Sequence, residues 1–246
     1  MFRLDDKRIV ITGAASGIGR ETAITASKLG ATIIMVDMSE TGLKETYSNL
    51  MHGNHSYYTA DLTNIDYIAD MVNMIVEKNG LLNGFVHCAG ISSRTPLNVL
   101  TKEKFAKVMN VNFYSFVELV RQICKKKHFV DGGSVVAMSS ISSLRGYKAK
   151  SEYCVSKAAV DAFIRCIALE LAERHIRINS VMPSAVNTPM ATRAHEMNTL
   201  LGITEIEAPL GIVEPYEVAN TIVFLLSDAT KTITGTSILI DGGYCI

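Results

Sequence analysis

The sequence lacks an excess of either charge. Its 246 residues carry 24 lysines and arginines against 24 aspartates and glutamates, which gives a formal net charge of zero. Binding to nucleic acid depends on a basic face that neutralises phosphates. The one basic cluster, 125–128, stands where a helix is expected to end, and cations are favourable at that place. We therefore expect no nucleic acid among the partners of this protein.

The sequence also lacks long apolar runs and paired cysteines. No stretch approaches the ~20 apolar residues that a membrane-spanning helix needs, and residues 1–6 show no apolar core of a signal peptide. The five cysteines are scattered, at 88, 124, 154, 166 and 245, a spacing typical of neither a metal site nor a disulfide framework. These absences predict no membrane association, no bound metal and a reducing, cytoplasmic location.

No repeat, low-complexity tract or flexible linker divides the chain, so a single domain spanning 1–246 is expected. Short apolar runs typical of strands alternate with helical patterns. This alternation predicts an α/β fold, with one doubly wound parallel sheet of about seven strands and helices on both faces. The expected strands cover 9–12, 32–36, 56–59, 84–87, 134–138, 177–181 and 237–240. The expected helices cover 17–29, 40–50, 64–79, 101–127, 151–174 and 215–226.

One stretch, 188–212, has scattered apolar residues and no strong pattern of a helix or strand. A loop of this length in a compact domain is usually functional. Its methionines, among them Met190 and Met197, would suit an adaptable apolar pocket. A plain surface excursion is the alternative.

A glycine-rich turn follows the first expected strand. Residues 12–19 read Thr-Gly-Ala-Ala-Ser-Gly-Ile-Gly, and a helical pattern then runs to Gly30. Glycines allow a tight turn and a close approach of the backbone to a ligand. The N-terminus of the following helix offers N–H groups and a positive dipole to a phosphate. Strand, glycine turn and helix together predict a dinucleotide site, with an ordinary loop as the alternative.

A tyrosine and a lysine with helical spacing form the second motif. Tyr153 and Lys157 are four residues apart, hence on one face of a helix, and Ser140 precedes the tyrosine by thirteen residues. An ammonium about 4 Å from a phenol lowers the pKa of the phenol by up to about 3 units at an effective dielectric of ~20. A tyrosine tuned in this way can act as a general acid or base. Taken alone, the pair also fits an exposed amphipathic helix.

Together these motifs resemble the short-chain dehydrogenase/reductase family, in the branch with chains of about this length. The resemblance covers nearly the whole sequence and includes the glycine spacing G-x-x-x-G-x-G. It extends, in the family's order, through Asp61-Leu62, 87–90, 110–112, 176–179, 183–188, 209–211 and 241–243. It implies a Rossmann-like fold, a nicotinamide cofactor and a substrate lid at about 188–212.

The resemblance also implies four catalytic residues. Tyr153 exchanges a proton with the substrate oxygen, and Ser140 holds that oxygen. Lys157 lowers the pKa of the tyrosine and binds the nicotinamide ribose, while Asn112 anchors a water that links the lysine to solvent. Hydride then passes between the cofactor and a secondary alcohol or its ketone. In this mechanism the cofactor supplies the chemistry and the protein supplies position and charge.

The cofactor contacts follow from the same resemblance. They are Gly13, Ser16, Gly17, Ile18, Gly19, Asp37, Asp61, Leu62, Cys88, Ala89, Gly90, Tyr153, Lys157, Pro183, Val186 and Thr188. At the end of the second strand, Asp37 can accept both ribose hydroxyls of the adenosine and would repel a 2′-phosphate. Ser16 and Met38 stand where relatives that prefer NADP often have basic residues. We therefore expect NAD as the cofactor.

Two residues depart from the family pattern. His87 and Cys88 replace a pair of asparagines, and Ser184 replaces a glycine. We interpret His87 as a hydrogen-bonded core residue. Ser184 could alter the fit of the cofactor or reach the substrate.

The substrate is left open by the sequence. Arg94 and Arg145 lie in loops expected to line the pocket, and either could anchor an anionic group, although surface charges are the favoured interpretation. Sugars, polyols, hydroxysteroids and 3-oxoacyl thioesters all fit the motifs. A non-catalytic, NAD(H)-sensing regulator is the remaining alternative. Relatives pair through two long helices, here 101–127 and 151–174, so we expect a homotetramer.

Overall fold

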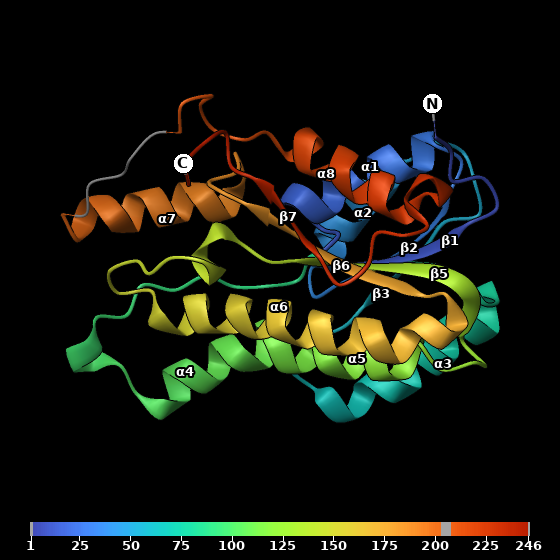
Figure 1. Ribbon diagram of the computed structural model, residues 1–246, viewed down its shortest axis with the longest axis horizontal. Coiled ribbons are helices and arrows are strands. Elements are labelled where there is room, and N and C mark those ends of the chain that lie inside the picture. The colour runs from blue at the N-terminus through green and yellow to red at the C-terminus, as the bar shows by residue number, and fades with distance from the viewer. Residues whose placement is uncertain (1, 203–207, 246) are drawn as a thin grey trace.

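A single parallel sheet between two layers of helices forms the protein, as the computed structural model in Figure 1 shows. The structure describes residues 2–202 and 208–245. The strands lie in the order β3-β2-β1-β4-β5-β6-β7, and every neighbouring pair is parallel. They are β1 (Arg8–Thr12), β2 (Thr32–Asp37), β3 (Ser56–Thr59), β4 (Leu82–His87), β5 (Phe129–Met138), β6 (Arg177–Pro183) and β7 (Ser237–Ile240). The predicted fold class is confirmed.

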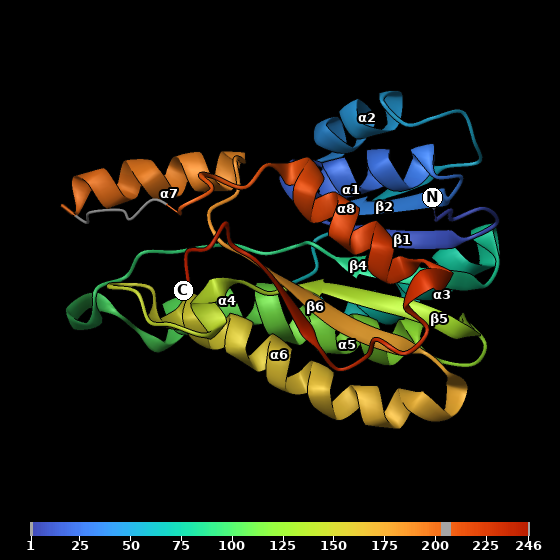
Figure 2. The ribbon, with the colours of Figure 1, turned by 45° about the horizontal axis from the view of Figure 1, so that its top comes forward.

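Helices cover both faces of the sheet (Figures 1 and 2). One face carries α1 (Gly17–Lys28), α2 (Glu40–Ser48) and α8 (Pro215–Leu226). The other carries α3 (Ile65–Asn79), α4 (Lys102–Met109), α5 (Ser115–Ile123) and α6 (Ser151–Leu171). Each layer encloses its own apolar core.

The pleat of the central strands explains the two cores. Ile9 and Ile11 of β1 point into the core beneath α1 and α8, whereas Val10 points into the core beneath α3, α5 and α6. Successive side chains of a strand face opposite sides, so a strand buried on both faces must be apolar throughout. The continuous apolar runs of the sequence therefore predicted the strands well.

The stretch 188–212 differs from the expectation, because it contains a helix. Helix α7 spans Pro189–Leu200, and the Thr188 side chain caps it by accepting a hydrogen bond from the Ala191 N–H. The apolar side chains of α7 do not form one buried stripe; Met197 and Leu200, for example, are exposed. This is why the sequence showed no helical period here. Residues 203–207 of the stretch lie outside the described residues.

The helix expected at 101–127 is interrupted. A five-residue π-helical turn, Asn110–Tyr114, separates α4 from α5, which ends at Ile123. Single π turns inside helices are frequent at functional sites. Here the turn carries Asn112, which is fully buried. None of the helices in the described ranges is long and apolar enough to cross a membrane.

The glycine turn depends on close backbone contact. Gly13 has a φ of +69°, and a Cβ built on it would stand 2.6 Å from the backbone nitrogen of Ala89. A Cβ on Gly19 would stand 2.2 Å from the Gly13 carbonyl oxygen. Such distances exclude any side chain at either position. The first turn of α1 therefore packs directly on the loop that follows β1, which in turn packs on the loop that follows β4.

Candidate active site

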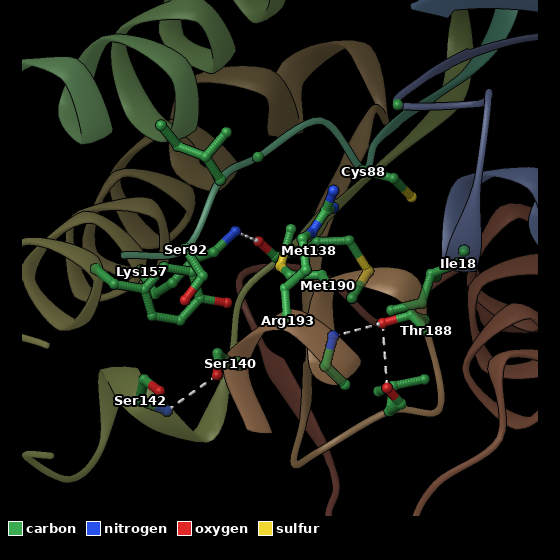
Figure 3. Close-up of a pocket in the computed structure, with 18 of the residues that line it drawn as sticks. Ile18, Cys88, Ser92, Met138, Ser140, Ser142, Lys157, Thr188, Met190 and Arg193 are labelled. Carbon is green, nitrogen blue, oxygen red and sulfur yellow. Dashed lines mark hydrogen bonds between the residues drawn. The ribbon is translucent and has the colours of Figure 1, made fainter. Parts of the chain in front are cut away.

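A cleft of about 1740 Å³ opens at the carboxyl ends of the parallel strands. Its walls are the loops that follow β1 to β6, together with α7, one side of α4 and residues near the C-terminus. The chain runs outward from β1 to β2 and β3 and then crosses back to β4, so the strand order reverses between β1 and β4. Ligands of doubly wound sheets bind at this reversal. Figure 3 shows Ile18 and Cys88 from the two sides of the reversal, with Thr188 and Met190 from the end of β6 and from α7.

The N-terminus of α1 is suited to an anion. Its cap, Ser16, makes no side-chain hydrogen bond to the helix, and the first turn contains no acidic residue. The N–H groups and the positive end of the helix dipole are therefore available to a pyrophosphate. Thr188 lies opposite, with its methyl carbon 3.3 Å from where a Gly17 Cβ would stand. The space left by the glycines thus fits the cofactor predicted from the motif.

Asp37 lies at the end of β2, on the side of the cleft where the sequence predicts the adenosine. One carboxylate oxygen accepts from the Ala15 N–H at 3.1 Å and the other from the Ser39 N–H at 3.0 Å. The side-chain cap of α2 is Ser39, whose hydroxyl accepts from the Gly42 N–H. Asp37 is therefore not the capping side chain of α2. Its carboxylate lines the cleft.

Ser140, Tyr153 and Lys157 meet at the other end of the cleft. The Ser140 hydroxyl accepts from the Ser142 N–H at 3.1 Å, and Lys157 Nζ donates to the Met138 carbonyl at 2.7 Å (Figure 3). Lys157 Nζ lies 5.7 Å from the centre of the Tyr153 ring. Ser139, the neighbour of Ser140, also lines the cleft, but its hydroxyl donates to Asp161 at 2.7 Å. Of the two serines, Ser140 is the one hydrogen-bonded to Tyr153.

The pKa values differ from the sequence-based expectation. Burial raises the pKa of Tyr153 to about 12, and its hydrogen bond with Ser140 only partly opposes this shift. Burial also lowers the pKa of Lys157, to about 8. The expectation that Lys157 lowers the pKa of Tyr153 is therefore wrong. Loss of hydration sets the direction of both shifts.

Asn112 lies behind the wall of the cleft, whereas the other predicted site residues line it. Its amide oxygen accepts from the Ile91 N–H at 2.8 Å, and its amide nitrogen donates to the Ile91 carbonyl at 3.0 Å. The same nitrogen lies 3.0 Å from the Ser156 hydroxyl. Asn112 thus ties the loop after β4 to α6 and holds the wall beside Lys157.

His87 is a hydrogen-bonded core residue, as interpreted from the sequence. Its Nδ1 lies 2.9 Å from the Thr12 hydroxyl, and its ring stacks on Phe116 at 5.1 Å. Burial lowers the pKa of His87 to about 3. Burial also raises the pKa of Cys88 to about 12, so this thiol, which lines the cleft, stays protonated. Among the described residues no group of three His, Cys, Asp or Glu side chains could hold a metal ion.

The two arginines of the expected pocket have different places. Arg94 lines the cleft and donates to the Lys148 carbonyl at 2.9 Å. Arg145 packs over the rings of Tyr147 and Tyr244, at 5.6 and 5.0 Å, outside the described lining of the cleft. Arg145 therefore holds the C-terminal segment against the loop after β5. Ser184 lines the cleft, where a hydroxyl can reach a ligand.

Three cations of the cleft were not singled out from the sequence. Lys107 of α4 and Arg193 of α7 line it, and Lys150 Nζ lies 4.6 Å from the centre of the Tyr153 ring. A capping threonine followed by proline, as in Thr188-Pro189, is a helix start signal that would have revealed α7 and hence Arg193. No comparable signal exists for Lys150.

Known proteins resemble the chain over its whole length. A family model described as enoyl-(acyl carrier protein) reductase matches residues 13–245. A 3-oxoacyl-(acyl-carrier-protein) reductase of Thermotoga maritima is 34% identical over 248 residues, with 100% of both chains covered. The chain belongs to the short-chain dehydrogenase/reductase family.

Other members of the family differ in the reactions that their names describe. A cyclopentanol dehydrogenase of Comamonas sp. is 29% identical over 250 residues, with 99% of each chain covered. The crystal structure of levodione reductase matches with a TM-score of 0.90 at 28% identity and covers 98% of each chain. The family consists of oxidoreductases that use nicotinamide cofactors, and this short-chain dehydrogenase/reductase has their fold throughout.

Replacing His87 by asparagine is expected to make the fold less sensitive to acid. The histidine has a pKa of about 3 when folded and about 6.5 when exposed. Between these values the unfolded state binds more protons, so falling pH removes up to about 1.4 kcal/mol of stability per unit. Urea unfolding at about pH 7, 5.5 and 4.5 should show a shallower loss in His87→Asn than in wild type.

His52→Asn is the control, because His52 is exposed. It should follow wild type at every pH. A parallel loss of stability in wild type and His87→Asn would mean that His87 is protonated in the folded protein.

Proposed function

We propose that this protein is an NAD(H)-dependent oxidoreductase that interconverts a secondary alcohol and its ketone. The observation that carries the proposal is the joining of two independent motifs in one cleft. The glycine turn and α1 fit a dinucleotide at one end, and Ser140, Tyr153 and Lys157 meet at the other. A dinucleotide extended between them would bring its reactive ring to the tyrosine.

The predicted contacts would hold the cofactor along this cleft. The N–H groups at the start of α1 would bind the pyrophosphate, and Lys157 would bind the nicotinamide ribose. Bound NAD supplies the hydride acceptor, and NADH the donor. Asp37 favours NAD over NADP, because its carboxylate would repel a 2′-phosphate. Met38, which follows Asp37, is 74% exposed at the cleft and offers no positive charge in compensation.

Three residues of the site would have different roles at the substrate oxygen. Ser140 would hold the oxygen, and Tyr153 would give it a proton in ketone reduction and take one in alcohol oxidation. The Lys157 ammonium, which is fixed on the Met138 carbonyl, would stabilise the tyrosinate that forms during the reaction. Lys157 is buried, so this stabilisation is stronger than between two fully hydrated groups.

Two alternatives remain. The first alternative is a 3-oxoacyl-thioester reductase that uses NAD(P)H. Such an enzyme would need the same residues of the site, and the 34% identical relative is a 3-oxoacyl-(acyl-carrier-protein) reductase by name. Asp37 disfavours an NADPH-dependent reductase, because its carboxylate would repel the 2′-phosphate. A non-catalytic, NAD(H)-sensing regulator would keep the dinucleotide half of the cleft but would not need Ser140, Tyr153 and Lys157 together.

The reducing cytoplasm stays our proposal for the location. All five cysteines are free thiols. Disulfides form and persist in oxidising compartments, so unpaired cysteines favour a reducing one.

Tyr153→Phe is expected to reduce turnover by about 10²–10⁴-fold and to leave NADH binding unchanged. Phenylalanine keeps the ring and removes only the proton-transferring hydroxyl. The assay is oxidation of a panel of secondary alcohols at alkaline pH, with binding followed by NADH fluorescence. Tyr216→Phe, an exposed site on α8, is the matched control and should behave as wild type. Substantial turnover in Tyr153→Phe would exclude this mechanism.

Asp37→Ser combined with Met38→Arg is expected to reverse the cofactor preference. The carboxylate that repels the 2′-phosphate is removed, and an arginine that can bind it is introduced. The ratio of kcat/KM for NADP⁺ to that for NAD⁺ should rise by at least about tenfold, the equivalent of one charged contact at ~1.4 kcal/mol. Equal use of NAD⁺ and NADP⁺ by the wild type would contradict the assignment.

We also propose a homotetramer that pairs through α4, α5 and α6. Large apolar side chains are exposed on and beside these helices, among them Tyr114, Val155 and Leu169 at 50%, 46% and 79%. Exposed apolar groups gathered on one face mark an interface. Light scattering at micromolar concentration should give the mass of four chains, and a stable monomer would contradict the proposal.

A further inference from the structure

A buried carboxylate stands one helical turn beyond Lys157. Asp161 is 6% exposed and belongs to α6, four residues after the lysine. At 1.5 Å per residue, this separation is about 6 Å along the helix axis. Both side chains therefore emerge on the same side of α6, toward the sheet.

Three hydroxyls surround the Asp161 carboxylate. Ser139 and Ser180 lie 2.7 Å from its two oxygens, and Ser237 lies 3.2 Å from the oxygen that Ser180 contacts. These serines come from the end of β5, from β6 and from β7, so a single carboxylate ties three neighbouring strands to α6. Hydrogen bonds from hydroxyl groups favour the charged form of a buried carboxyl group.

We propose that Asp161 is a positioning residue of the active site, which supplies the buried negative charge that keeps Lys157 an ammonium and holds Ser139 so that Ser140 faces the cleft. The part that concerns the reaction rests on the proposed function. The part that concerns the charge of Lys157 does not.

The surroundings of Lys157 single out Asp161. Burial lowers the pKa of Lys157 to about 8, and this shift is opposed first by Cys88 and then by Asp161. The other titratable groups near the lysine are Tyr153, His87 and Cys88, with pKa values of about 12, 3 and 12, and each is therefore uncharged near pH 8. Lys150, whose Nζ lies 4.6 Å from the centre of the Tyr153 ring, adds positive charge. Met138 contributes a carbonyl and Asn112 an amide. Among the described groups that act on Lys157, Asp161 is the one carboxylate.

The second proposed role of Asp161 is to orient Ser140. Ser139 donates to Asp161 on the α6 side of the sheet, and consecutive residues of an extended chain point to opposite sides. Fixing Ser139 therefore fixes the direction in which Ser140 points. Ser140 itself has an extended φ of −167°, as this alternation requires.

A double-mutant cycle tests the charge effect without any substrate. Asp161→Asn and Lys157→Met are made singly and together, and urea unfolding is measured for the full chain near pH 7 and near pH 9.5. Near pH 7, where Lys157 is protonated, Asp161→Asn should lower the urea midpoint more in the wild-type background than in the Lys157→Met background. Near pH 9.5, the difference between the two backgrounds should shrink. This pH lies above the folded pKa of about 8, so Lys157 is then largely neutral in the proteins that retain it.

Glu152→Gln is the matched control. Glu152 is also a fully buried carboxylate of α6 and is held by serine hydroxyls, with Ser93 at 2.7 Å and Ser151 at 3.2 Å. It is absent from the groups that act on Lys157. Its substitution should lower the midpoint equally in both backgrounds. If Asp161→Asn behaves like Glu152→Gln, its role is structural only and the proposal is overturned.

The effect of Asp161 on the reaction is tested separately from unfolding, by kinetics. If the protein turns over an alcohol, Asp161→Asn should move the alkaline limb of kcat/KM to lower pH by about one unit, a tenfold change in the proton equilibrium of Lys157. An unchanged alkaline limb, with the coupling to Lys157 present in unfolding, would remove Asp161 from the reaction. Absence of turnover in wild type would instead count against the proposed function and leave the unfolding test decisive.

Discussion

The cleft exists because two loops at the centre of the sheet touch through their backbones. The turn after β1 meets the loop after β4 at the point where the strand order reverses, and a side chain on Gly13 would collide with Ala89. Gly19 brings α1 equally close to Gly13. These contacts place the N-terminus of α1 at the point where the strand order reverses. The other residues of the site line the space beside this contact.

Several buried polar groups in and behind the wall of the cleft are held in an otherwise apolar interior. Lys157 is fixed by a carbonyl, His87 by a threonine hydroxyl and Asp161 by serine hydroxyls. Burying a charge is expensive unless it is hydrogen-bonded and paired, and the two charged groups of this set lie one turn apart on α6. In the proposed mechanism, this arrangement places an ammonium where a tyrosinate forms. Burial raises the pKa of Tyr153 to about 12.

The sequence predicted most of the fold because the strands are apolar on both faces and the glycine turn has a strict spacing. It also predicted Ser140, Tyr153 and Lys157 as one set, and the structure brings them to one cleft. Helix α7 was not foreseen, because its apolar residues are exposed and show no period. The role of Asp161 could not be read from the sequence. Its partners are 22, 19 and 76 residues away, and only the folded sheet brings them together.

The most direct test of the account is a spectrophotometric oxidation screen of the wild-type protein with NAD⁺ at alkaline pH. The panel should include polyols, sugars, hydroxysteroids, 3-hydroxyacyl thioesters and simple secondary alcohols. The account predicts a rise in the absorbance of reduced nicotinamide with at least one secondary alcohol. No rise across the panel, in a protein that still binds NADH tightly, would contradict the assignment as an alcohol-oxidising enzyme and favour a dinucleotide-sensing role.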